Sequence, residues 1–326
     1  MNVESASVKS AKVELTDKEK LRKTNRRELR NYLRQNWQLY VLLLLPLAFA
    51  LTFKYAPLSG LVLAFKDYKI ARGIWGSEWV GFQVFQDIFA HRDFIRALRN
   101  TLLLNGLDLI FSFTAPIFLA LLLNEIRHSM YKRVNQSLLY LPHFLSWPII
   151  GALAYQLLGL GSGLVNNVIE MLGGDRVPFL QSDYHWLASY VGIGVWASMG
   201  WGTIIYLAAI SGVNPELYEA ATVDGAGRWR KMWNVTLPSI RPTIITLLIL
   251  NLGRIMGGSF EQIFALQNKA TNEFTTTIPV LVYRWGIESG DFSRATAVGL
   301  FQSVVGLILI LIADRIAKKL GEDGLL

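Results

Sequence analysis

The chain has 326 residues, of which 52% are hydrophobic and only 17% are charged, and its mean hydropathy is +0.34. A soluble fold of this length does not need so much apolar surface, so the composition excludes a soluble enzyme with one anchor and favours a polytopic membrane protein. Cysteine is absent, which excludes disulfides and thiolate metal sites, and the four histidines do not have the spacing of metal ligands.

The first 36 residues are rich in Lys, Arg, Glu, Ser and Thr and contain few large apolar side chains. They lack the apolar centre of a secretory signal peptide. We therefore predict a cytoplasmic tail over residues 1–36 that is partly helical from Asp17.

Six apolar stretches follow, and each is long enough to cross a membrane as a helix, which needs about 20 residues. They are 38–63, 97–123, 134–158, 187–210, 239–266 and 296–318. The sequence therefore predicts an all-α membrane domain over residues 37–326 with six transmembrane helices. Because the number of spans is even, both termini lie on the same side of the membrane.

The distribution of lysine and arginine predicts which side that is, because these residues concentrate in cytoplasmic segments. Ten lie before Trp37, three in 124–133, four in 211–241 and three after Ala313, and fewer lie in the opposite segments. Both termini are therefore expected in the cytoplasm. This topology accounts for most of the formal net charge of +8, so the charge does not indicate nucleic-acid binding.

Polar residues recur at helical spacing within two of the predicted spans. They are Asn105, Asp108 and Ser112 in the second span and Asn251, Arg254, Gly258 and Glu261 in the fifth. Ionisable groups at membrane depth are costly, so they usually face a partner or a cavity. Two interpretations stay open: either Asp108 or Glu261 neutralises Arg254 and locks the helices together, or both stripes line a substrate pathway in which Arg254 contacts an anionic or hydroxyl-rich solute.

Small residues recur at intervals of four in the fourth and fifth spans. They are Gly194, Ser198 and Gly202 in the fourth span, and Gly253 and Gly257 in the fifth. This spacing is typical of close helix packing. We expect that packing to involve a second membrane subunit.

The polar segment between the fourth and fifth spans has the features of a short helix. Asn214 can cap it, Pro215 suits its first position and Glu216 complements the dipole. The glycines at 225 and 227 provide a stop and a turn. Such a helix could dock into a groove of another protein, or it could lie on the membrane surface as an amphipathic helix.

No G-x-x-x-x-G-K-[ST] motif occurs, so the chain does not cradle nucleotide phosphates in the Walker manner. An intramembrane enzyme that uses Asp108, Glu261 and Arg254 as an acid–base site is a weaker alternative, because no group of side chains forms a convincing catalytic constellation. The sequence therefore favours a transport subunit over an enzyme.

The segment 219–238 resembles the signature loop of ABC importer permeases. The resemblance rests on Glu-Ala-Ala at 219–221, Asp-Gly at 224–225 and Leu-Pro at 237–238. The usual isoleucine two residues before the Leu-Pro pair is replaced by Val235. The resemblance implies a type I importer permease fold. It also implies that 211–238 is the ATPase-coupling loop, in which Glu219, Ala220, Ala221, Gly225, Leu237 and Pro238 seat against a cytoplasmic ATPase.

Four further stretches resemble the permease subgroup that serves complex oligosaccharides and polysaccharides, and most of all the first permease subunit of alginate importers. They are 55–60, 64–68, 163–166 and 258–264. This resemblance implies import of an oligosaccharide or polysaccharide, a uronate such as alginate, through the bacterial cytoplasmic (inner) membrane. A permease for phosphate, peptide or amino acids is the alternative.

The resemblance also implies a set of partners and a mechanism. The partners are a second, related permease that completes a heterodimer, a dimer of ATPase subunits and an extracytoplasmic solute-binding protein. ATP and magnesium would be bound by the ATPase, and the chain itself would need no cofactor. Transport would proceed by alternating access.

Overall fold

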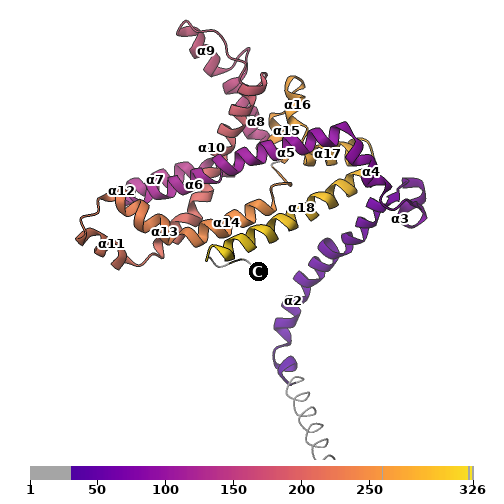
Figure 1. The fold of residues 1–326 in the computed structure, drawn as a ribbon, viewed down its shortest axis with the longest axis horizontal. Coiled ribbons are helices and arrows are strands. Elements are labelled where there is room, and N and C mark those ends of the chain that lie inside the picture. The colour runs from indigo at the N-terminus through magenta and orange to yellow at the C-terminus, as the bar shows by residue number, and fades with distance from the viewer. Residues whose placement is uncertain (1–30, 259, 322–323, 325–326) are drawn as a thin grey trace, which may run out of the picture. The chain divides into compact units, whose positions relative to one another are not determined.

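The computed structural model describes residues 31–258, 260–321 and 324. The chain divides into two compact units, 1–61 and 62–326. Most of the predicted tail, including the helix expected from Asp17, lies outside the described residues. Within the described part, helices dominate and the few strand residues form one short antiparallel ribbon (Figure 1).

The elements follow in chain order, and the irregular helical turns carry the label η. They are α2 (Trp37–Ala50), η1 (Leu51–Tyr55), η2 (Ala56–Phe65), β1 (Lys66–Asp67), η3 (Ile70–Arg72), α3 (Gly73–Gly76), β2 (Glu78–Trp79), α4 (Gln83–Ala90), α5 (Arg92–Phe111), α6 (Thr114–Asn124), α7 (Ser129–Tyr140), η4 (Leu141–Phe144), α8 (Trp147–Leu158), α9 (Leu164–Met171), α10 (Asp183–Ser211), α11 (Pro215–Val223), α12 (Arg228–Lys231), η5 (Met232–Thr236), α13 (Leu237–Ser239), α14 (Arg241–Gly253), α15 (Phe260–Leu266), η6 (Lys269–Thr271), α16 (Asn272–Thr275), α17 (Ile278–Tyr283), η7 (Arg284–Glu288) and α18 (Phe292–Lys319).

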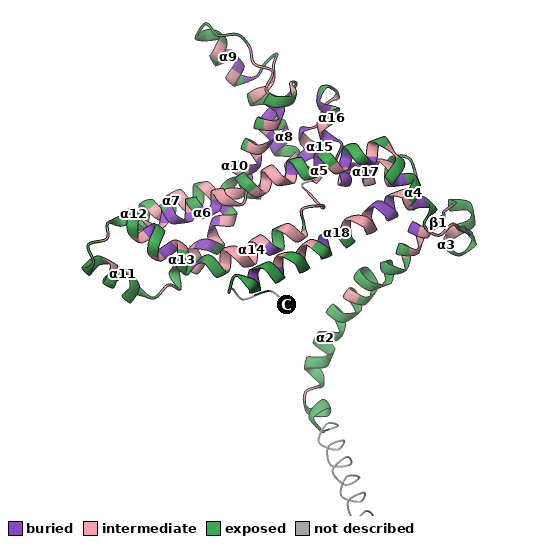
Figure 2. Cartoon of the chain, in the orientation of Figure 1, coloured by how far each residue is buried: buried purple, intermediate pink, exposed green. Residues whose placement is uncertain are grey.

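Four helical stretches are long and apolar enough to cross a membrane unbroken. They are Trp37–Phe65, Arg92–Asn124, Asp183–Ser211 and Phe292–Lys319, and they cover the first, second, fourth and sixth predicted spans. The described residues of α2 have no buried side chain (Figure 2). An apolar helix with that exposure suits a lipid or protein environment rather than water.

The third predicted span, 134–158, is divided by a sharp bend. The stretch Ser129–Phe144 meets α8 at 102°. Pro142 and Pro148 flank the bend, and each removes a backbone donor and hinders continuation of a helix from the preceding turn. The two halves count as one span only if the bend lies within the membrane.

The fifth span was predicted as one continuous helix over 239–266, and this prediction is wrong. The stretch Arg228–Ser239 meets α14 at 59°, α14 ends at Gly253, and helix resumes only at Phe260. Gly258 has a φ of +42°, a backbone conformation that side chains with a Cβ rarely adopt. Asn251, Arg254, Gly258 and Glu261 therefore do not share one helical face.

Several glycines of the fourth and fifth spans pack closely against other elements of this chain, while the expected packing against a second subunit stays a prediction. A Cβ on Gly253 would meet the side chain of Ile310 at 2.3 Å, and one on Gly202 would meet Pro116 at 2.8 Å. A Cβ on Gly200 would lie only 1.9 Å from the carbonyl oxygen of Leu139. The α7 backbone therefore approaches α10 as closely as a helix surface allows.

Three apolar clusters hold the larger unit together. One of them joins α6 and the end of α10 to the segment that follows α11, through Ile117, Leu121, Tyr206, Met232 and Ile240. This cluster anchors the α11–α13 region to the membrane helices. Figure 1 shows α11 and α12 at the end of the α5–α6 stretch that is remote from α4.

Candidate coupling loop and transport cavity

The helix predicted between the fourth and fifth spans is α11. Asn214 caps it, with Oδ1 accepting a hydrogen bond of 3.0 Å from the backbone N–H of Glu216, and Pro215 occupies the first turn. Both features were expected from the residue types, because an Asn cap and a proline at the first turn satisfy or avoid the free N–H groups of a helix start. The helix therefore begins where the sequence predicts.

The other end of α11 is closed by a Schellman motif. Gly225 has a φ of +75°, its N–H donates to the carbonyl of Thr222 at 3.0 Å, and the N–H of Ala226 donates to the carbonyl of Ala221 at 2.8 Å. Glycine is favoured at this position because the left-handed conformation costs other residues more. Both ends of α11 are thus fixed by local hydrogen bonds.

Two side-chain contacts fasten α11 to the segment that leads into the next span. The hydroxyls of Tyr218 and Thr236 share a hydrogen bond of 3.1 Å, and the Lys231 Nζ donates to Thr222 Oγ1 at 2.6 Å. Thr236 is buried and directly precedes the Leu-Pro pair. The helix is therefore a supported element rather than a loose loop.

The opposite side of α11 is open. Of the predicted coupling residues, the exposed ones are Glu219, Ala220, Gly225 and Pro238, and the half-buried ones are Ala221 and Leu237. The Glu219 carboxylate makes no hydrogen bond or ion pair with any described residue, and Val223 beside it is 89% exposed. Figure 2 shows this end of the unit mostly exposed. The loop presents a free carboxylate and an apolar side chain on a stiff support.

A cavity of about 700 Å³ lies among the membrane helices of the larger unit. Its lining includes Asn105, Asp108, Asn251, Arg254 and Gly258, five of the six residues that the sequence suggested for a substrate pathway. The sixth, Glu261, is not part of the lining, and Gln262 next to it is. The break after α14 turns the chain so that the neighbouring residue faces the cavity.

The ion pair considered for Arg254 is absent among the described residues. Asp108 instead accepts hydrogen bonds from the Tyr190 hydroxyl at 2.9 Å and from Ser112 Oγ at 3.4 Å. Asn105 Nδ2 donates to the carbonyl of Ile255 at 2.7 Å and so satisfies backbone that the break leaves outside a helix. Arg254 lines the cavity without a carboxylate partner among the described residues.

Sequence reasoning missed the aromatic part of the lining. The rings of His143 and Trp201 stack with centroids 4.5 Å apart and an angle of 8° between their planes, and Trp147 also lines the cavity. The stack forms because Gly200 lets the α7 backbone approach α10 and the turn at Pro142 then carries His143 onto its neighbour. Only the Gly-Trp and Pro-His pairs hint at this in the sequence.

The cavity combines one cation, several amide and hydroxyl groups and flat aromatic faces. Such a lining suits a polar ligand with hydroxyl or carboxylate groups and C–H faces. Among the described residues, no group of three or more His, Asp or Glu side chains could hold a metal ion.

The chain matches a known protein family and several known proteins. Residues 111–322 match the model of the binding-protein-dependent transport system inner membrane component. Protein LplB of Bacillus subtilis is 48% identical over 293 residues, covering 90% of this chain and 92% of LplB. The chain belongs to this family. It is therefore a transport component of the inner membrane and not an enzyme.

Further relatives agree with that assignment. The polygalacturonan/rhamnogalacturonan transport system permease protein YteP of Bacillus subtilis is 44% identical, covering 93% of this chain and 95% of YteP. A chain from the crystal structure of a bacterial alginate ABC transporter, in complex with an alginate pentasaccharide-bound periplasmic protein, superimposes with a TM-score of 0.82 at 39% identity. That match covers 90% of this chain and 98% of the other. The fold is that of a type I ABC importer permease.

Proposed function

We propose that this chain is one permease subunit of an ATP-driven importer for an oligosaccharide or polysaccharide, and that its solute is acidic, a uronate such as alginate. The observation that carries the proposal is Arg254, a cation in the cavity with no carboxylate partner among the described residues. A guanidinium suits a sugar carboxylate, because it can donate two parallel hydrogen bonds. The similarity to YteP and to the alginate transporter supports the same class of solute.

The cavity lining supports a sugar for a second reason. Asn105, Asn251 and Gln262 supply amide groups that can bind hydroxyls, while the His143–Trp201 stack supplies a flat apolar face for a pyranose ring. A permease for phosphate, peptide or amino acids would have little use for such a face.

The proposed assembly contains a second, related permease, two ATPase subunits and an extracytoplasmic solute-binding protein. ATP and magnesium bind to the ATPase subunits. The loop at 211–238 couples them to transport, with Glu219, Ala220 and Val223 on the face of α11 that meets the ATPase. Closure of the ATPases upon ATP binding displaces α11 and opens the cavity outward to receive the solute. ATP hydrolysis then returns the cavity to the state that is open inward.

The test is ATP hydrolysis in proteoliposomes that contain the chain with its candidate permease, ATPase and binding protein. Glu219→Lys should abolish the stimulation of ATP hydrolysis by uronate oligosaccharide, because it reverses the charge at the proposed contact between α11 and the ATPase. Asp224→Lys is the control: it makes the same change in charge in the same loop, at the helix C-terminus where a cation is tolerated. Unchanged stimulation of the Glu219 variant would refute the coupling role.

The same assay tests the solute. Stimulation of the wild-type complex by a uronate oligosaccharide, and not by a neutral one, is the expected result. Stimulation by sn-glycerol-3-phosphate instead would favour the solute named for the UgpA permeases of Yersinia pestis, which are 28% identical to this chain. That outcome would replace the sugar but keep the transport role.

A further inference from the structure

Three arginines form a row on the outward face of α5, at its first two turns. Arg92, Arg96 and Arg99 are spaced by four and three residues, so they lie above one another on one side of the helix. All three are exposed, with the side chains of Arg96 and Arg99 at 42% and 58%. The residues of the opposite face, such as Phe94 and Leu104, are buried in the core.

The same outward face changes from basic to apolar further along the helix. Continuing the spacing of the row leads to Leu103 and Ile110, which are 38% and 59% exposed. Exposed apolar side chains at these positions suit contact with lipid chains. We therefore expect the boundary between hydrocarbon and headgroups along α5 to lie between Arg99 and Leu103.

The length of the helix agrees with that depth. The stretch Arg92–Asn124 has 33 residues, so it extends about 50 Å at 1.5 Å a residue. The hydrocarbon of a bilayer is only about 30 Å thick. Part of the stretch must lie beyond the hydrocarbon, and the arginine row occupies one of its ends.

This end is remote from the coupling loop. The other end of the stretch, at Ile117 and Leu121, packs with Met232 and Ile240 beside α11. Near the arginine row, the start of α18 lies at a similar level, since the Trp285 ring contacts both His91 at 5.3 Å and the Arg294 guanidinium at 5.8 Å. If the coupling loop is cytoplasmic, the row lies at the outer leaflet.

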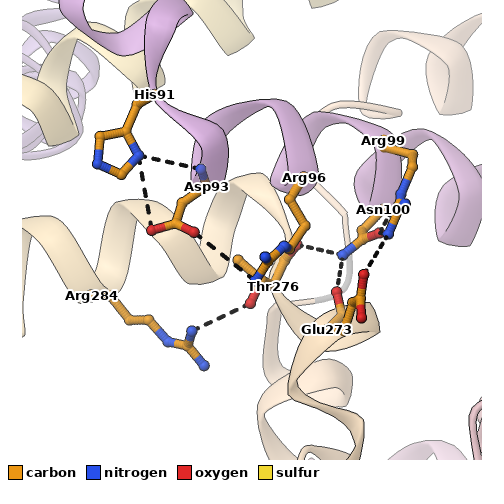
Figure 3. A network of polar contacts seen from close by, with 8 residues as sticks. All are labelled: His91, Asp93, Arg96, Arg99, Asn100, Glu273, Thr276 and Arg284. Atoms are coloured by element: carbon orange, nitrogen blue, oxygen red, sulfur yellow. Dashed lines mark hydrogen bonds and ion pairs between the residues drawn. The ribbon is translucent and has the colours of Figure 1, made fainter.

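Neighbouring carboxylates leave the row only partly neutralised, as Figure 3 shows for Arg96 and Arg99. The Arg96–Asp93 pair is 4.0 Å apart and the Arg99–Glu273 pair 3.7 Å apart, both too long for good hydrogen bonds. Arg92 makes no side-chain hydrogen bond or ion pair with any described residue. Arg99 also donates from Nε and Nη2 to Asn100 Oδ1 at 3.3 Å. The available guanidinium donors are therefore mainly those of Arg92 and Arg96.

Basic residues at the outer end of a span oppose the usual charge distribution of membrane proteins, so their presence needs a compensating partner. We propose that Arg92, Arg96 and Arg99 bind the phosphate groups of anionic lipids in the outer leaflet. A guanidinium group can donate two parallel hydrogen bonds to the oxygens of one phosphate. Neighbouring arginines on a helix face are about 5–6 Å apart, so they can reach the same lipid or adjacent ones. The lipid steadies the outer end of α5, whose next turns line the cavity.

The experiment is native mass spectrometry of the complete detergent-purified transporter, titrated with phosphatidylglycerol. A glycosyl diacylglycerol with the same acyl chains but no phosphate, and inorganic phosphate alone, are the comparison ligands. The wild-type complex should retain phosphatidylglycerol and not the glycolipid. Arg92→Gln/Arg96→Gln should weaken phosphatidylglycerol binding roughly tenfold. Arg92→Lys/Arg96→Lys should weaken it less, because lysine keeps the charge and loses only the paired hydrogen bonds.

The matched control is Lys69→Gln/Arg72→Gln, which removes two positive charges from exposed positions before α4 and should leave lipid binding unchanged. Because Arg92 has no side-chain hydrogen bond or ion pair to lose within the described chain, Arg92→Gln alone should fold normally and serves for the same comparison. Equal loss in both double variants, equal binding of the glycolipid, or displacement of the lipid by equimolar inorganic phosphate would overturn the proposal. Loss of a protein subunit from the arginine variant, with lipid retained, would assign the row to a protein interface instead.

Discussion

Arg254 and Asp108 show how the meaning of a charged residue depends on its neighbours. Both line the cavity. The Asp108 carboxylate accepts hydrogen bonds from Tyr190 and Ser112, whereas Arg254 has no carboxylate partner among the described residues. Their spacing in the sequence predicted that both residues matter. Only their contacts in the structure distinguish an ion pair that joins two helices from a charged group that is available to a ligand.

Replacing Arg254 should therefore affect the solute before it affects the fold. In Arg254→Gln, we expect the KM for a uronate oligosaccharide to rise roughly 10- to 150-fold, because a charge-assisted hydrogen bond contributes about 1.5–3 kcal/mol. Uptake measurements in proteoliposomes would give this value, with Arg230→Gln on the exposed coupling loop as the control.

A charge-reversal pair checks the alternative. Arg254→Glu should impair transport, and adding Asp108→Lys should not restore it, since the two side chains make no ion pair in the structure. Recovery of uptake in the double variant would contradict the role given to Arg254.

Gly200 illustrates a residue whose importance is steric. A Cβ there would lie 1.9 Å from the carbonyl oxygen of Leu139, so α7 and α10 would have to separate. We expect Gly200→Ala to destabilise the protein by about 1–3 kcal/mol, the usual effect of overpacking, and to disturb the His143–Trp201 stack. Thermal unfolding of the purified complex would measure it.

Gly192 on the same helix gives the comparison, because a Cβ there meets no atom within 4 Å. Gly192→Ala should leave the unfolding temperature unchanged or raise it slightly. Similar destabilisation by both substitutions would mean that the approach of α7 to Gly200 does not decide the effect, since helix propensity alone favours alanine at both positions.

At the scale of elements, the ends of α11 were predictable from the sequence, whereas the break between α14 and α15 was not. The start and stop of α11 were predictable because Asn214, Pro215 and Gly225 act on backbone groups within a few residues of themselves. The break after Gly253 was not, because the hydrogen bond that satisfies the Ile255 carbonyl there comes from Asn105 on α5, about 150 residues earlier in the chain.

The Schellman motif at the end of α11 makes a direct prediction. In Gly225→Ala the left-handed conformation at φ +75° should cost about 1–2 kcal/mol, loosen the end of the helix and lower coupled ATP hydrolysis. Gly227→Ala is the control, since its φ is −69° and its Cβ would meet nothing within 4 Å. The ratio of solute-stimulated to basal ATP hydrolysis is the measurement, and equal ratios for both variants would exclude a role for this turn.

At the scale of the whole molecule, composition and hydropathy predicted an all-helical membrane protein, and the family match and the solved alginate transporter confirm that class. The number of spans is less direct: within the described part of the chain, four helical stretches are long and apolar enough to cross a membrane, and six are reached only if each bent pair is one span. Hydropathy detects apolar length but detects neither the bend near Pro142 and Pro148 nor the one between Ser239 and Arg241, and these two bends explain the difference.

The orientation can be tested because the natural sequence has no cysteine. In cells, Asp224→Cys in the coupling loop should react with a membrane-impermeant maleimide only after the membrane is opened, whereas Arg72→Cys should react at once. Labelling of both from outside, or of neither, would contradict an arrangement with the coupling loop in the cytoplasm.

The hydrogen bond between Tyr218 and Thr236 connects α11 to the segment that leads into α14, so a movement of α11 would be transmitted toward Arg254. From Thr236 only α13 and α14 separate the coupling helix from Arg254, and α14, with 13 residues, is a rod of about 20 Å. A tilt of about 10° at its base would carry its far end sideways by roughly 3 Å, comparable to the length of one hydrogen bond. If α11 and Arg254 act as proposed, a small displacement of α11 would therefore be enough to break one hydrogen bond between Arg254 and a sugar carboxylate. The last part of this connection, α14, is uninterrupted from Arg241 to Gly253.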